Sequence, residues 1–293
     1  MNKAVLGVIG GSGVYDLPEL EDATELDVES PWGEPSAPLR RGRIGDTTVV
    51  FLPRHGIGHR LSPTGVNYRA NVDALKRAGV TDLVSFSACG SYKADIGPGV
   101  FVLIDQFIDR TFRRPSSFFG DGCVAHVPFS DPVAPKLVAR IAQAATSAAV
   151  PHVLGGAYVC MEGSQFSTRA ESLAYKAMGA SVVGMTNMPE AKLAREAEIS
   201  YASVCMVTDF DAWRPQETGV EVPQVLAVMR QNSEKARRLV TELAKGFPEF
   251  HEVCPIGSDR ALEGAIVTPP QSRDPALVAM LGAIAGRVLP EVR

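Results

Sequence analysis

Short apolar runs, mostly of β-branched residues, recur along the chain, and each has the length of a buried strand. They are separated by polar and small residues that are typical of turns. Seven such runs predict strands: Val5–Ile9, Thr47–Leu52, Leu83–Ser87, Val100–Ile104, Ala157–Cys160, Val182–Met185 and Ser203–Thr208.

Several of the intervening stretches have helical periodicity. The pattern predicts helices over Asn67–Ala78 and over the alanine-rich Pro135–Ala149. The clearest helix is Pro223–Lys245, where proline suits the first turn and the following glycine suits the end. Its apolar residues fall on one face at helical spacing.

A fourth helix is expected over Glu190–Ala197, with Asn187 as its cap and Glu190 completing a capping box. The alternation of strands and helices predicts an α/β layered fold. No repeat or linker divides the chain, so we expect residues 1–293 to form a single domain. The segment Asp109–Asp131 is rich in Arg, Ser, Phe and Gly and is interpreted as a long functional loop.

Composition narrows the class of protein. The chain has 293 residues, of which 45% are hydrophobic, and a net charge of −4. It has no basic stripe of the kind that nucleic-acid binders carry, so any bound anion must be held by local groups. The five scattered cysteines favour buried, reduced thiols in a cytoplasmic protein over a zinc site or disulfides. No signal peptide or transmembrane run is expected, so no membrane partner is predicted.

The first predicted strand runs into a glycine-rich loop, "VLGVIGGSGVYD". A dinucleotide site needs G-x-G-x-x-G at the start of a helix, and the third glycine of that frame is replaced here by Asp16. A nucleoside triphosphate loop needs a Gly-Lys-Ser/Thr sequence, which the chain lacks. Backbone amides and the hydroxyl of Ser12 still make the loop an anion candidate, although a plain turn is the commoner interpretation.

Two other predicted strands end in donor-rich segments. "PRHGIGHR" places Arg54 beside His55, and an arginine fork suits phosphate oxygens, although a solvated arginine is equally compatible. "SFSACGS" offers the Ser87 hydroxyl and the unshielded amide of Ala88. Ligands of α/β sheets lie at the carboxyl ends of strands, so these segments together predict a site for free phosphate.

Eight blocks between Gly7 and about Leu226 resemble the nucleoside phosphorylase family, and within it the enzymes that cleave 5′-methylthioadenosine. The blocks are "GVIGGSGVYD", "RHGIGH", "VNYRANVDALK", "SACGSY", "DQFIDRT", "CMEGSQFSTRAES", "VVGMTNMPEAKLAREAEISYA" and "MVTDFDAW".

The resemblance implies a three-layer α/β/α fold with a central mixed, partly barrel-like sheet. The implied activity is phosphorolysis of 5′-methylthioadenosine to adenine and 5-methylthioribose 1-phosphate, in purine and methionine salvage. No metal or organic cofactor is implied, since inorganic phosphate is the co-substrate. Relatives of this type are usually trimers, and the C-terminus lacks the cysteine-rich tail of archaeal hexamers, so a homotrimer is expected. By the same resemblance the phosphate contacts are Ser12, Arg54, His55, Ser87, Ala88 and Thr186.

The "TDFD" sequence offers two carboxyl groups, Asp209 and Asp211, to the departing purine. Protonation at N7 requires a general acid beside the base, and we assign it to Asp209. On an extended segment residues i and i+2 face the same way, so both carboxyls are expected to reach one ring edge. Phosphorylases of 6-oxopurine nucleosides have asparagine where Asp209 stands. Two aspartates therefore favour adenine.

The resemblance also assigns the remaining substrate contacts. Phe166 packs on the purine, Ser167 is a polar contact to the base, and Met185 lies against the sugar. Ser164 departs from the family pattern, in which proline is common at that position. Val222, Val225 and Leu226 match the apolar pocket of the 5′ group, although all three also suit ordinary helix packing, and His126 matches a residue donated across a subunit interface.

Three alternatives remain. A 6-oxopurine nucleoside or methylthioinosine phosphorylase is the nearest, and Asp209 with Asp211 argues against it. A nicotinamide-dependent oxidoreductase fails on the glycine spacing. An inactive binding protein on the same fold would be expected to lack the phosphate donors, which are present.

Overall fold

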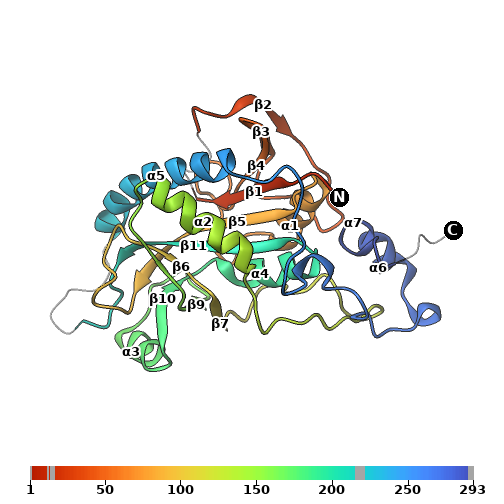
Figure 1. Ribbon diagram of the computed structural model, residues 1–293. Helices are drawn as coiled ribbons and strands as arrows, with labels where there is room; N and C mark the ends of the chain where they lie inside the picture. Colours follow the sequence, from red (N-terminus) through yellow and green to blue (C-terminus); the bar gives the residue numbers. More distant parts are fainter. Residues whose placement is uncertain (1, 12, 14–16, 215–221, 290–293) are drawn as a thin grey trace.

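The carboxyl ends of several neighbouring strands meet at one edge of a large mixed sheet, which the helices cover on both faces (Figure 1). The structure is a computed structural model that describes residues 2–11, 13, 17–214 and 222–289. Along the described chain the strands are β1 (Val5–Gly10), β2 (Glu21–Leu26), β3 (Leu39–Ile44), β4 (Thr47–Pro53), β5 (Asp82–Ser91), β6 (Phe101–Leu103), β7 (Gln106–Arg110), β8 (His152–Leu154), β9 (Ala157–Met161), β10 (Ala180–Gly184) and β11 (Ser200–Asp209).

The sheet is mixed, and β5 is its branch point. The main path runs β2-β3-β4-β1-β5-β10-β9-β7, while β11 pairs with β5 and β6, and β8 pairs with β6. Strands β4, β1, β5 and β11 are mutually parallel along their pairings, whereas β10 meets the end of β5 antiparallel. The ends of β1, β4, β5 and β11 therefore face the same edge of the sheet.

The helices are α1 (Tyr68–Arg77), α2 (Pro135–Ser147), α3 (Arg169–Ala177), α4 (Asn187–Glu196), α5 (Val222–Lys245), α6 (Pro275–Met280) and α7 (Gly282–Ala285), with 3₁₀ turns at Ser258–Arg260 and Pro270–Ser272. Helices α2 and α5 pack together against β11, and α1 and α4 pack together on the other side with α7 against α1 (Figure 1). The three-layer α/β fold with a central mixed sheet, expected from the sequence, is confirmed.

All seven predicted strands are present, because each is a buried apolar run. The predicted helices correspond to α1, α2, α4 and α5. Strand β2 was not anticipated because its sequence, EDATEL, is almost entirely exposed. The expected loop from Asp109 to Asp131 begins inside β7 and continues as irregular chain.

The expected capping box at Asn187 is wrong. Helix α4 takes Thr186 as its N-cap without a side-chain hydrogen bond, and the backbone is not helical at Met188. The Asn187 amide instead donates to Ser203, and Glu190 accepts hydrogen bonds from Arg54. The two polar side chains that resemble a cap therefore bind partners on β11 and at the end of β4.

The five cysteines are buried free thiols. Within the described residues, no helix is both long enough and apolar enough to cross a membrane.

Candidate active site

A cavity of about 760 Å³ opens at the shared edge of β1, β4, β5 and β11, beside the start of α5. Its wall brings together most of the residues predicted for the site, although they come from segments far apart in the chain. Those that line it are Arg54, His55, Ser87, Ala88, Phe166, Met185, Thr186, Asp209, Asp211, Val225 and Leu226. Three predicted residues, Ser167, Val222 and His126, do not line it.

Arg54 lies directly after β4 with only 1% of its surface exposed. Its Nε and Nη2 form a double hydrogen bond with the Glu190 carboxylate at 2.7 and 3.1 Å. Nη2 also donates to Ser85 Oγ at 2.6 Å, and Nη1 donates to the Phe86 carbonyl at 2.9 Å. The guanidinium is thus fixed on three sides.

These contacts limit what Arg54 can offer to a ligand. A guanidinium has five N–H groups, and the protein acceptors occupy all but one on Nη1 among the described residues. Burial by itself lowers the pKa of Arg54, but the charge and hydrogen bonds of Glu190 outweigh it and raise that pKa. Arg54 is therefore a permanently charged donor whose charge is already balanced.

The His55 side chain is neutral at pH 7. Burial, and then the neighbouring Arg54 charge, lower its pKa to about 4. Its Nδ1 lies 2.9 Å from the Leu61 carbonyl, which must accept, so Nδ1 carries the single ring proton. The ring therefore has no N–H at Nε2, while the backbone N–H of His55 meets no acceptor in the part of the chain that the structure describes. An anion is best contacted by that backbone group.

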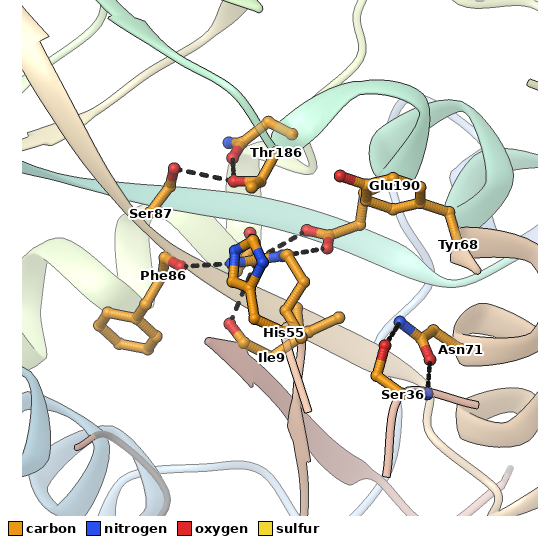
Figure 2. A network of polar contacts seen from close by, with 12 residues as sticks. Ile9, Ser36, His55, Tyr68, Asn71, Phe86, Ser87, Thr186 and Glu190 are labelled. Carbon is orange, nitrogen blue, oxygen red and sulfur yellow. Dashed lines mark hydrogen bonds and ion pairs between the residues drawn. The ribbon is translucent and has the colours of Figure 1, made fainter. Parts of the chain in front are cut away.

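Two hydroxyl groups meet beside Arg54. Ser87 Oγ, on β5, lies 3.0 Å from Thr186 Oγ1, at the end of β10 (Figure 2). The Tyr158 hydroxyl contacts both residues: it lies 3.3 Å from Ser87 Oγ and 3.4 Å from the Thr186 backbone nitrogen. The phenol passes under Gly184, where a Cβ would lie 2.1 Å from it. This end of the cavity therefore presents uncharged hydroxyl donors.

Asp209 and Asp211 lie at another part of the wall, where β11 ends. Asp209 accepts hydrogen bonds from Thr208 Oγ1 at 2.7 Å and from the Asp211 backbone nitrogen at 2.8 Å. Burial raises the pKa of Asp209, and Asp211 adds to that effect. This carboxyl group is therefore easier to protonate than an exposed one.

The expected reason for the pairing of these aspartates is wrong, although both do line the cavity. Strand β11 ends at Asp209, and Asp211 has a positive φ of 51°. The two carboxyls are therefore brought together by a tight turn and not by the alternation of an extended strand. Tyr92 completes the arrangement by donating to Asp211 Oδ2 at 2.9 Å.

Phe166 and Met185 supply apolar wall between the two polar ends. Met185 lies close over Gly163, where a Cβ would stand 2.6 Å from its sulfur. Ser167 lies behind this wall, with its hydroxyl 3.5 Å from Met161 Sδ. Gly163 therefore gives Met185 the room it needs at the cavity wall.

The 5′-side predictions separate into two groups. Val225 and Leu226 line the cavity from the N-terminal end of α5, whereas Val222, the first residue of that helix, does not line it. His126 is exposed on the long loop, away from the cavity of its own chain. Ser12 lies outside the described residues, but its neighbours Gly11 and Gly13 line the cavity.

Sequence reasoning missed several residues that shape this site. Glu190 was interpreted as a helix cap, and Tyr158 has the pattern of a core residue. Arg237, half-buried on α5, donates to the Gly13 carbonyl at 2.6 Å and lines the cavity. None of the three carries a local signal, because each acts through a contact distant in sequence.

A glycine-rich strand end, a buried arginine and a pair of aspartates around one cavity define a class of nucleoside-handling enzymes. The chain belongs to the phosphorylase superfamily, whose profile matches residues 5–245.

Particular members of this superfamily are similar along nearly their whole length. The S-methyl-5′-thioadenosine phosphorylase of Bradyrhizobium diazoefficiens is 63% identical over 289 residues, covering 99% of both chains. The enzyme of the same name from Cereibacter sphaeroides is 56% identical, covering 98% of this chain and 99% of its own. The crystal structure of a methylthioadenosine phosphorylase from an antarctic soil metagenomic library superposes with a TM-score of 0.88 at 42% identity, covering 97% and 99%.

A methylthioadenosine phosphorylase from Schistosoma mansoni, solved in complex with tubercidin, superposes with a TM-score of 0.76 at 39% identity. The match covers 83% of this chain and 91% of that one. The fold is therefore shared with enzymes whose names specify methylthioadenosine.

Proposed function

We propose that this chain catalyses the phosphorolysis of 5′-methylthioadenosine to adenine and 5-methylthioribose 1-phosphate. The observation that carries the proposal is one cavity that holds Arg54 with two hydroxyls in one part of its wall and Asp209 with Asp211 in another. A nucleoside bound between them has its anomeric carbon towards the anion donors and its base towards the carboxyls. The names of the similar enzymes support the same substrate.

In the proposed reaction a phosphate oxygen forms a bond to C1′ while the bond from C1′ to N9 breaks. The electron pair of that bond passes into the purine, and Asp209 donates a proton to N7. Phosphate is held by the Ser87 and Thr186 hydroxyls, by the amides of His55 and Ala88, by the remaining N–H of Arg54 and by Ser12. Catalysis is then mostly positioning at near-attack distance and electrostatic complementarity. No metal or organic cofactor takes part.

The raised pKa of Asp209 supports its role as the acid, because a protonated carboxyl is needed before the base leaves. Asp211 accepts a proton of the adenine 6-amino group. Phe166 packs on the base and Met185 on the sugar. Val225 and Leu226 provide the apolar surface for the methylthio group, and we assign no direct contact to Ser167 or Val222.

A 6-oxopurine phosphorylase remains the second candidate, because it needs the same phosphate donors. Two aspartates facing the base favour adenine, because the ionised Asp211 cannot donate to a 6-oxo oxygen and Asp209 gives its single proton to N7.

We further propose a homotrimer of single-domain subunits in the cytoplasm. One apolar cluster extends from Leu6 to Leu289, which supports a single domain. The exposed His126 is available to a neighbouring subunit, and five buried free thiols suit a reducing compartment. Light scattering coupled to size exclusion tests the trimer, and a monomeric mass with full activity would contradict it.

The decisive assay measures adenine release from methylthioadenosine with and without phosphate, beside methylthioinosine, adenosine and inosine. We expect phosphate-dependent release and a strong preference for methylthioadenosine. Release without phosphate would identify a hydrolase, and faster turnover of methylthioinosine would identify the 6-oxopurine alternative.

A further inference from the structure

The last residues of β5, with Tyr92 directly after them, contact the turn that carries the two aspartates. Thr208 Oγ1 lies 3.2 Å from the Cys89 carbonyl, and Trp213 Nε1 donates to the Ser91 carbonyl at 2.8 Å. Between these two contacts, the Tyr92 hydroxyl donates to Asp211 Oδ2 at 2.9 Å. Two hydrogen bonds, one to the Ser91 carbonyl and one from the Tyr92 hydroxyl, therefore hold the turn that carries Asp211.

Tyr92 is fixed by its own surroundings. Its side chain is 1% exposed and packs with Val159, Tyr175 and Val183 in a small apolar cluster separate from the main core. Its backbone nitrogen donates to the Ser181 carbonyl at 2.9 Å. Because this packing holds the ring, the hydroxyl stays beside Asp211, the charged group among its polar neighbours Asp211, Ser167 and Ser172. Burial, and then Asp211, raise the pKa of Tyr92, so the phenol keeps its proton and acts as the donor.

The backbone of Asp211 has a turn conformation. Its φ of 51° lies in the left-handed region, which is uncommon for residues other than glycine but is adopted by aspartate more readily than by most. With Oδ2 occupied by the phenol, Oδ1 accepts no hydrogen bond within the described chain and is left for a donor in the cavity. A 6-amino group offers that donor, whereas a 6-oxo group brings a second acceptor.

We propose that Tyr92 is a positioning residue that orients Asp211 as a pure acceptor and thereby sets the preference for 6-amino over 6-oxo purines. The inference rests on the proposed function, since it deepens the assignment of the base-binding end. Without the phenol proton the Asp211 carboxyl can rotate or become a donor, and an oxo group is then tolerated.

The test compares Tyr92→Phe with Tyr158→Phe, because each tyrosine contacts residues of one of the two polar parts of the wall. The control, Tyr158, is also fully buried, but its hydroxyl contacts Ser87 and Thr186. For Tyr92→Phe we expect the ratio of kcat/KM for methylthioadenosine to that for methylthioinosine to fall about tenfold, because a hydrogen bond to a charged group is lost. The change should arise in the nucleoside KM, with the phosphate KM unchanged. Tyr158→Phe should raise the phosphate KM and leave the ratio in place.

Equilibrium binding of adenine and hypoxanthine by calorimetry supplies a readout independent of turnover. Tyr92→Phe should weaken adenine about tenfold relative to hypoxanthine, and the same substitution should have no effect on that ratio in an Asp211→Asn background. An unchanged ratio in the folded Tyr92→Phe variant, or an equal loss with and without Asp211, overturns the proposal. A wild-type protein that binds adenine but releases none from methylthioadenosine contradicts the proposed function instead, and leaves the binding test of Tyr92 valid.

Discussion

Gly90 and Asp209 face each other in register across β5 and β11, and a Cβ at Gly90 would lie 2.8 Å from Asp209 Oδ1. The same atom would lie 3.1 Å from Asp211 Cβ. Because Gly90 has no side chain, both aspartates can pack directly against β5 at this position.

We expect Gly90→Ala to displace Asp209 and Asp211 and to lower kcat/KM for methylthioadenosine on the order of 100-fold, since small misplacements of catalytic groups have effects of that size. Steady-state kinetics with methylthioadenosine measure the loss. The matched control is Gly120→Ala, where the added Cβ meets open space and φ is ordinary. Equal activity of the two variants would show that the close approach at Gly90 is without consequence.

Asp209→Asn removes the acid that we assign to N7. General acid catalysis contributes roughly 10²–10⁴-fold, so turnover of methylthioadenosine should fall by at least the lower figure. Because an amide can donate to O6 and N7 of a 6-oxopurine, some activity on methylthioinosine or inosine should appear. Parallel kinetics on both substrates measure the shift, and unchanged turnover of methylthioadenosine would remove Asp209 from the mechanism.

Glu190→Gln leaves the Arg54 guanidinium buried without its counter-charge. Removing one partner of a buried pair costs about 3–5 kcal/mol, so the free energy of unfolding should fall by that amount and the phosphate KM should rise. Denaturant unfolding and phosphate saturation curves measure the two effects.

The matched acid-to-amide change for this test is Asp22→Asn at the surface pair with Arg43, whose side chains are 51% and 74% exposed for Arg43 and Asp22. It should cost less than about 1 kcal/mol. If Glu190→Gln were as mild as Asp22→Asn, the buried pair would not be what fixes Arg54.

The pKa values of two histidines are shifted in opposite directions, so they should affect stability in different pH ranges. The lowered pKa of His55, about 4, means that the unfolded chain binds its proton first as the pH falls below 6.5. The stability that His55 contributes is thus complete above pH 6.5 and is lost between 6.5 and 4. His251 has its pKa raised by a hydrogen bond from Nδ1 to Asp82, 2.8 Å away, so its contribution is complete below pH 6.5 and is lost as the pH rises through the raised value.

Proton NMR of the histidine ring signals checks both directions. His55 should stay neutral down to about pH 4, and His251 should still be charged above pH 6.5. A His55 signal that titrated near 6.5 would contradict its burial beside a charged arginine.

Sequence reasoning recovered the strands of the centre because burial on both faces leaves continuous apolar runs. It missed β3, LRRGRI, because three arginines interrupt its apolar residues and leave no such run. The sequence also indicated the phosphate-binding residues, because donor-rich turns that follow parallel strands lie at the same edge of the sheet.

The sequence did not reveal the residues that position the site residues. Glu190 resembles a cap because the local spacing is right, and only the tertiary fold reveals that its partner is Arg54, 136 positions away. Tyr92 lies within a recognisable block, yet nothing local indicates that its hydroxyl reaches Asp211 across 119 positions. Contacts between residues so far apart in the chain leave no periodic pattern in the sequence from which they could be predicted.

The double hydrogen bond between Arg54 and Glu190 also bears on how an anion arrives and departs. A cation that carries its own counter-ion has almost no field at a distance, so this pair does not steer phosphate in from solution, and its contribution to binding should vary little with ionic strength. The newly formed sugar phosphate likewise meets no unbalanced positive charge at Arg54 that would slow its release. At this position an anion is therefore recognised by aligned dipoles at short range, and it can be released after each turnover.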